Sequence, residues 1–154
     1  MAKIKVENSE ITILSVENTD FISLTDMANA KESESRAADI IKNWIRTRFA
    51  LEFLSTWELI NNPNFKVVES DHFKMQAGLP SFTLSISEWI EKTNAVGITV
   101  KKGKYGGTFA HKDIAFEFGS AISVSFKLYL IKEFQRLKEE EFKQIGWSAK
   151  RELA

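Results

Sequence analysis

The sequence predicts an α+β fold in which two β-hairpins flank a helical centre. Short runs of β-branched and aromatic residues occur at 11–24 and at 98–110, and turn residues interrupt each run. Between and after these runs, apolar residues recur at intervals of three and four, which is typical of amphipathic helices. Strand-rich and helix-rich stretches that are segregated in this way indicate the α+β class.

Composition and charge narrow the range of functions. The chain has 154 residues, which is enough to bury a hydrophobic core without disulfides or a structural metal. It has no cysteine, which excludes disulfides, thiolate metal sites and cysteine nucleophiles. No apolar run approaches the roughly 20 residues that span a bilayer. We therefore expect a soluble cytoplasmic protein without membrane contact. Because 21 basic residues balance 21 acidic ones, any nucleic-acid contact must depend on how the charges are distributed.

The first hairpin and the helices after it follow from local signals. We expect residues 1–10 to form an N-terminal arm, and 11–16 with 21–24 to pair around the turn-rich segment ENTD. Thr25 is expected to cap a short helix. Helical periodicity then covers roughly 36–61 and allows a break near Phe49.

Smaller elements are predicted between this helix and the second hairpin. FKVVE (65–69) predicts a short strand, and the segment 70–78 predicts a short helix capped by Asp71. Ser85 and Glu88 have the spacing of a capping box and start a helix that extends to about Thr93.

Two helices are expected after the second hairpin. The first starts at Lys112, and Ser123 or Ser125 caps the second. Residues 139–154 remain helix-prone without a clean heptad repeat. They are compatible with a solvated terminal helix or with continuation into a further region.

The second hairpin carries the more distinctive of two basic segments. A phosphate-binding loop would need a lysine and a hydroxyl at the start of a helix, whereas Gly103-Lys104 is followed by a tyrosine and then a strand-like run. We interpret the tip either as a contact for the phosphates of duplex DNA or as a solvated turn whose charges aid solubility. The candidate contacts are Lys101, Lys102, Lys104, Tyr105, Gly106, Gly107 and Thr108.

The other basic segment is IIKNWIRTR, residues 40–48. On a helix its apolar residues face inward, so that Lys42, Asn43 and Arg46 face outward. Asparagine and arginine three residues apart suit the major groove, where they commonly contact adenine and guanine. Arg48 is the fourth candidate, although we expect it to pack on Trp44 or pair with Glu52. The alternative is an exposed amphipathic helix with ordinary charges.

The sequence offers no catalytic constellation. His72 and His111 are the only histidines, and no Ser-His-Asp order or glycine-flanked nucleophile is present. His111 stands at the expected start of a helix, where a capping or packing role is predicted. We therefore expect neither enzymatic activity nor a bound metal or cofactor.

Six segments in order resemble the KilA-N domain of phage, large DNA virus and bacterial proteins, which is related to the fungal APSES domain. They are FISLTDMANAK, IKNWIRTR, EFLSTWELINNPNF, SFTLSISEWIEKTNAVGI, GKYGGTFAHKDIAFEF and FKLYLIKEFQRLK. The resemblance covers roughly residues 11–150. It implies a winged-helix-like fold, with a helix-turn-helix formed near 25–31 and from 36, an insertion at about 50–95 and a wing at 98–110.

The resemblance also implies a function. We assign 11–138 to a DNA-binding domain and 139–154 to a helical extension. The expected protein is a transcriptional regulator of phage or prophage type that contacts double-stranded DNA through the basic helix and the lysine-rich wing. The alternative is an antirepressor-like module that binds another regulator. Exposed residues of the C-terminal helix such as Phe142, Ile145 and Trp147 would serve such a partner or a homodimer.

Overall fold

A five-stranded antiparallel sheet forms the centre of the computed structural model, which describes residues 1–31, 35–104 and 106–153, with side chains as far as residue 147. The strands are β1 (Ala2–Val6), β2 (Ser9–Val16), β3 (Thr19–Ser23), β4 (Ile98–Lys101) and β5 (Gly107–His111), in the spatial order β1-β2-β3-β5-β4. The helices are α1 (Leu24–Asn29), α2 (Ala37–Ile45), α3 (Arg48–Asn61), α4 (Val67–Gln76), α5 (Ile86–Thr93), α6 (Lys112–Ile122) and α7 (Val124–Leu153). The expected α+β class is confirmed.

Two tight hairpins join the first three strands. Glu7-Asn8 and Glu17-Asn18 have positive φ angles at both positions, as two-residue turns between twisted strands require. The predicted pairing of 11–16 with 21–24 is confirmed as β2 and β3. Strand β1 was not predicted, because its segment was expected to form an arm, although Ile4 and Val6 alternate with lysines as in a half-buried strand.

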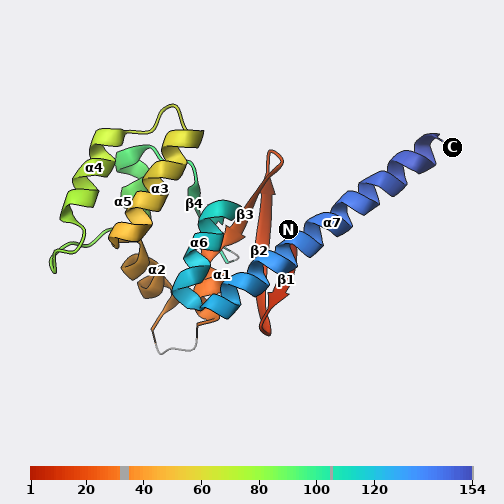
Figure 1. Cartoon of the computed structure of the whole chain (residues 1–154), viewed down its shortest axis with the longest axis horizontal. Coiled ribbons are helices and arrows are strands. Elements are labelled where there is room, and N and C mark those ends of the chain that lie inside the picture. The colour runs from red at the N-terminus through yellow and green to blue at the C-terminus, as the bar shows by residue number, and fades with distance from the viewer. Residues whose placement is uncertain (32–34, 105, 154) are drawn as a thin grey trace.

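One face of the sheet forms the main core. Register pairs such as Ile4 with Ile11, Ile22 with Ala110 and Ala110 with Ile98 lie on that face and are buried. Helices α6 and α7 pack against these strands, and Phe118 of α6 is fully buried. Figure 1 shows α7 crossing beside β1 and then continuing far beyond the domain.

Helices α3, α4 and α5 form a second layer of apolar contacts on the opposite flank of the molecule (Figure 1). Phe65, Phe73 and Trp89 pack together there, with ring centroids 5.9 and 6.1 Å from that of Trp89. The prediction of a strand at 65–69 was wrong. These residues instead lead into α4, because burial of Ser70 and Phe73 at helical spacing outweighs the strand preference of two valines. Asp71 therefore lies inside the helix and does not cap it.

The helix caps were predicted in part. Ser85, His111 and Ser123 each accept a hydrogen bond from the backbone of the helix that follows, as expected. The prediction for Thr25 was wrong, because Ser23 caps α1 by accepting from the Asp26 N–H at 3.0 Å. The predicted helix over 36–61 breaks at residues 46–47, slightly before Phe49, because Thr47 caps α3.

Candidate nucleic-acid interface

Helix α2 presents the first basic segment. Its apolar side, Ile40, Ile41 and Ile45, is buried. Trp44 is half-buried and packs edge-on against Phe118 of α6, with ring centroids 5.0 Å apart. The opposite side of the helix therefore faces solvent, and Lys42 and Asn43 are exposed there as expected.

Arg46 differs from the other residues of this segment. It follows the last residue of α2, is half-buried, and its Nη1 donates a hydrogen bond to the Phe82 carbonyl at 3.2 Å. Arg46 was expected to face outward with Lys42 and Asn43, whereas its guanidinium contacts the loop that precedes α5 and leaves the side chain only partly exposed. Arg48 pairs with Glu52 at 3.0 Å, which is one of the two arrangements that we expected.

The second basic segment forms the predicted hairpin, which we call the wing (β4, β5 and residues 102–106). Gly103 has a φ of 111°, and its carbonyl accepts from the Gly106 N–H at 3.0 Å. A Cβ at Gly106 would collide with the Lys101 carbonyl oxygen, so only glycine fits this turn. Lys101, Lys102 and Lys104 are exposed at the tip. The candidate contact Tyr105 lies outside the described residues.

A threonine of α1 holds the base of the wing. Thr25 Oγ1 accepts a hydrogen bond from the Thr108 N–H at 3.0 Å, and a Cβ at Gly107 would lie 2.9 Å from the same oxygen. The candidates Gly107 and Thr108 are therefore half-buried against α1. Helix α1 also packs against α2, so it joins the two basic segments.

A buried carboxylate anchors the start of β4. Glu58 of α3 is fully buried and accepts from the N–H groups of Val96 and Gly97, at 2.9 and 2.8 Å. Asn62 donates to the same carboxylate at 2.9 Å. A Cβ at Gly97 would lie 2.8 Å from Trp57 and 2.9 Å from Glu58, so glycine permits this close approach.

Sequence reasoning missed Glu58, although a signal was present. It occupies the same helical stripe as Leu51, Leu54 and Ser55, all of which are buried. A glutamate on an inward stripe indicates a carboxylate with buried donors. Its partners Val96 and Gly97 are too distant in the chain for a local pattern to reveal them.

His111 links the wing to α6. Its Nδ1 accepts from the Asp113 N–H at 3.1 Å, and its ring packs against Trp57 with centroids 4.9 Å apart. Burial lowers the pKa of the imidazole below its ordinary value of 6.5, and this effect outweighs the opposing one of Asp113. The neutral ring thus acts as a cap, as expected.

The wing tip also approaches the N-terminal strand. Lys104 and Gly106 line a cavity of about 390 Å³ together with Met1 and Lys3 of the β1 edge, and with Asp26 of α1. The Asp26 carboxylate accepts from the Thr12 N–H at 2.8 Å. Lys3, which pairs with Glu10 at 3.8 Å, thus lies beside the wing and was not among the candidate contacts.

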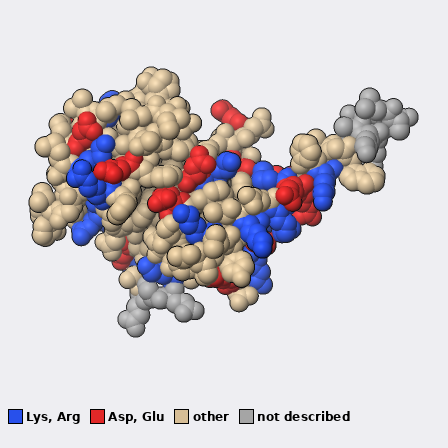
Figure 2. All heavy atoms as spheres, viewed as in Figure 1, with Lys and Arg blue, Asp and Glu red and all other residues tan. Residues whose placement is uncertain are grey.

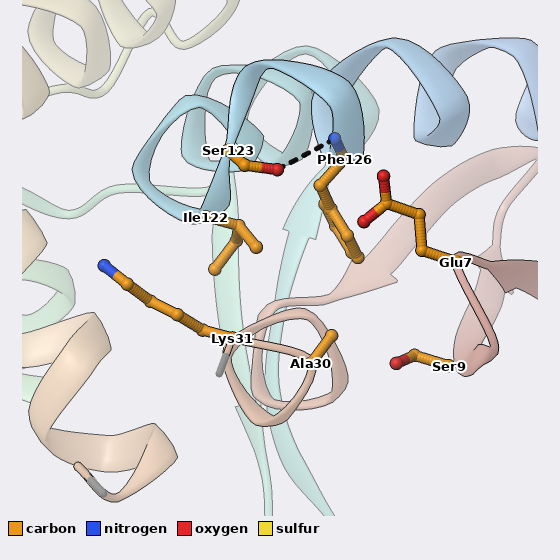
Figure 3. A pocket seen from close by; sticks show the side chains of 7 residues that line it. All are labelled: Glu7, Ser9, Ala30, Lys31, Ile122, Ser123 and Phe126. Carbon is orange, nitrogen blue, oxygen red and sulfur yellow. Dashed lines mark hydrogen bonds between the residues drawn. The ribbon is translucent and has the colours of Figure 1, made fainter. Parts of the chain in front are cut away.

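A second hollow of about 380 Å³ lies between the β1–β2 turn, the end of α1 and the α6–α7 junction (Figure 3). Its two charged side chains already have partners in that junction. Lys31 donates to the Ala121 carbonyl at 3.0 Å, and Glu7 accepts from the Ser125 hydroxyl at 2.8 Å. The first bond joins the end of α1 to α6, and the second joins the β1–β2 turn to the start of α7.

The family model that describes the KilA-N domain matches residues 4–140. The chain belongs to the KilA-N family. KilA-N domains are in general DNA-binding domains. The match begins within β1, so the KilA-N domain includes the N-terminal strands, and it ends part-way along α7. No curated protein and no solved structure was found to match the chain.

The described residues contain no candidate metal site and no candidate membrane span. In the part of this KilA-N chain that the structure describes, no group of three or more histidine, cysteine, aspartate or glutamate residues could hold a metal ion. Among the described residues, no helix is long and apolar enough to cross a membrane. On the face that Figure 2 shows, basic and acidic side chains are interspersed, most densely along α7.

Proposed function

We propose that this KilA-N chain binds double-stranded DNA as a transcriptional regulator of phage or prophage type, working in the bacterial cytoplasm. The observation that carries this proposal is the position of α1. It packs against α2 on one side and holds the wing through Thr25 on the other. Two basic segments that are separated in the sequence are thereby fixed relative to one helix.

In this proposal α1 and α2 act as the helix-turn-helix. Helix α2 enters the major groove, where Asn43 contacts a base edge and Lys42 a phosphate. Arg46 contacts DNA only if its bond to the Phe82 carbonyl is exchanged, and Arg48 only at the cost of its pair with Glu52. Asn43 is therefore the side chain from which we expect most of the sequence preference.

The wing supplies affinity that does not depend on sequence. Lys101, Lys102 and Lys104 lie at its exposed tip, where each neutralised phosphate would release counterions. The glycines around the turn let the backbone approach the duplex closely. The order of helix, helix, hairpin and helix supports a winged-helix arrangement in which α3, α4 and α5 are inserted between α2 and the wing.

Selection of duplexes from a random pool, followed by titration of the selected duplex with salt, tests this proposal. Lys102→Ala should weaken binding to all duplexes and reduce the salt slope by about 0.9. Asn43→Ala should instead relax the selected sequence at one position. Lys92→Ala, an exposed lysine of α5, is the matched control and should change neither property. Absence of duplex binding at low salt would overturn the proposal.

A second candidate function is an antirepressor-like module that binds another protein. Phe142, Ile145 and Trp147 are 76%, 68% and 67% exposed on the part of α7 beyond the domain, where they are accessible to a partner protein. Light scattering of the purified chain distinguishes the two functions. A monomer that binds DNA tightly and associates with no protein would count against the second.

A further inference from the structure

The two halves of α7 have different surroundings. In the first half Phe126, Leu130 and Phe134 are buried against the domain. The second half leaves the domain and extends into solvent (Figure 1). It nevertheless carries Phe142 and Ile145, both largely exposed. Because a short helix alone in water is marginally stable, apolar residues on this half suggest that another surface covers them.

Four apolar residues of α7 that are exposed or half-buried, two from each half, share one face of the helix. Leu128 and Ile131 in the first half, and Phe142 and Ile145 in the second, follow the alternating spacing of three and four residues that brings side chains to one seam. Leu128 is 62% exposed and Ile131 is half-buried, so this seam is accessible beside the domain as well. Gln135 and Lys138 occupy the two positions in between, which interrupts the apolar repeat. Gln135 is exposed, whereas Lys138 is half-buried and pairs with Asp20 of β3 at 2.7 Å.

We propose that a second copy of this chain covers the seam, with the two α7 helices antiparallel. Pairing centred between Gln135 and Lys138 sets Leu128 opposite Ile145 of the second copy, and Ile131 opposite Phe142 of the second copy. The projecting half of each helix then packs along the exposed face of the domain-bound half of the other. The polar layer falls at the centre, where such a layer fixes the register of a helix pair.

Charge decides between the two orientations. Lys132 and Glu139 are exposed on the same flank of the seam, in different halves of the helix. In the antiparallel pair each Lys132 lies across from Glu139 of the second copy, and two-fold symmetry repeats the contact. A parallel pair would instead bring Lys127, which pairs with Glu117 at 3.9 Å, close to Lys132 of the second copy, and the two lysines repel.

The dimer does not depend on DNA binding. If the chain also binds DNA as proposed, its two-fold symmetry predicts that the selected duplexes contain two inverted half-sites. The two proposals can fail separately, because dimerisation is measured by the mass of the protein and DNA binding by its affinity for a duplex.

The mass of the chain across a wide concentration range is the first test. Light scattering should give twice the mass of one chain at high concentration, and Ile145→Glu should raise the dimer dissociation constant by about tenfold or more. Trp147→Glu is the matched control, since Trp147 is equally exposed but lies about 140° round the helix from Phe142. A wild-type chain that is monomeric at every concentration, or two variants that behave alike, would overturn the proposal.

Charge exchange tests the orientation. Lys132→Glu and Glu139→Lys should each weaken the dimer by about tenfold, and the double exchange should restore it. In a parallel pair Lys132→Glu would strengthen association instead, and that result would overturn the antiparallel arrangement.

Because the sequence has no cysteine, introduced thiols give an independent readout. A mixture of Lys132→Cys chains with Glu139→Cys chains should form disulfide-linked mixed dimers under mild oxidation. Cross-linking of either variant on its own to the same extent would contradict the register.

Discussion

At the base of the wing, the buried Glu58 and the half-buried Thr25 hold the backbone. Glu58 accepts from the N–H groups of Val96 and Gly97, and Thr25 accepts from that of Thr108. At the tip, by contrast, Lys101 and Lys102 are exposed and the turn depends on glycines. Polar contacts at the base fix the position of the hairpin backbone, whereas the tip consists of charged lysines that pack little against the domain.

This difference separates two properties that the hairpin would need if it binds DNA as proposed. Substitution at the base should change folding first and DNA affinity as a consequence. Substitution at the tip should change affinity while the fold stays intact. The four predictions below test that separation, in order of their expected effect on the free energy of unfolding.

Glu58→Ala should have the largest effect. It removes the acceptor for three N–H groups that have little access to water, and we expect a loss of about 3 kcal/mol or more in the free energy of unfolding. Chemical denaturation measures this loss. Glu52→Ala, an exposed glutamate on the same helix, is the control and should cost much less. Equal losses for the two variants would show that the buried carboxylate does not anchor the wing.

Thr25→Val should have an intermediate effect. Valine preserves the shape of the side chain but removes the oxygen that accepts from the Thr108 N–H, so we expect a loss of about 1 kcal/mol. Thr25→Ser keeps the oxygen and should restore most of that loss. Duplex affinity should fall for the valine variant with an unchanged salt slope, because no phosphate contact is removed.

Acid should weaken the base of the wing through His111. Its folded-state pKa is lowered by burial, so the unfolded chain binds the proton more readily. The associated stability is complete above the ordinary pKa near 6.5 and is lost as the pH falls toward the folded-state pKa. Unfolding measured between neutral and mildly acidic pH should show this loss.

His111→Asn is the comparison for the acid prediction. Asparagine can still cap α6 but does not titrate, so its stability should fall less steeply with acid than that of the wild type. Parallel pH profiles for the two proteins would argue against a role for this imidazole.

The double variant Lys101→Ala, Lys102→Ala should leave folding almost unchanged. Both side chains are exposed, so we expect a change within about 0.5 kcal/mol. Its salt slope for duplex binding should nevertheless fall by about 1.8 if both lysines contact phosphates as proposed. A large loss of stability here would break the distinction between base and tip.

Local signals were sufficient for much of the fold. The β2–β3 and β4–β5 hairpins, the cap at Ser85 and the start of α6 at Lys112 were predicted because turn residues and capping groups act within a few positions. The exposure of Lys42 and Asn43 followed from the apolar period of α2. The basic segments of the candidate site were therefore visible in the sequence.

Hydrogen bonds between residues far apart in the sequence were not predictable in this way. Ser23 and Thr25 are equally good caps by type, but the Thr25 oxygen is used by Thr108, far along the sequence. A helical wheel places Arg46 on the outward side, whereas α2 ends there and the guanidinium donates a hydrogen bond to the Phe82 carbonyl. Tertiary partners decided both cases, and a single sequence does not reveal them.

The order of strands in the sheet has a consequence for folding. Strands β1, β2 and β3 are consecutive in the chain and can pair early, but the neighbour of β3 is β5, which follows all of the helical insertion. Until β5 arrives, the edge of β3 has unpaired backbone groups. Pairing of Phe21 with His111 closes a long loop, and such closures slow folding. We therefore expect docking of the β4–β5 hairpin to limit the rate at which the chain refolds.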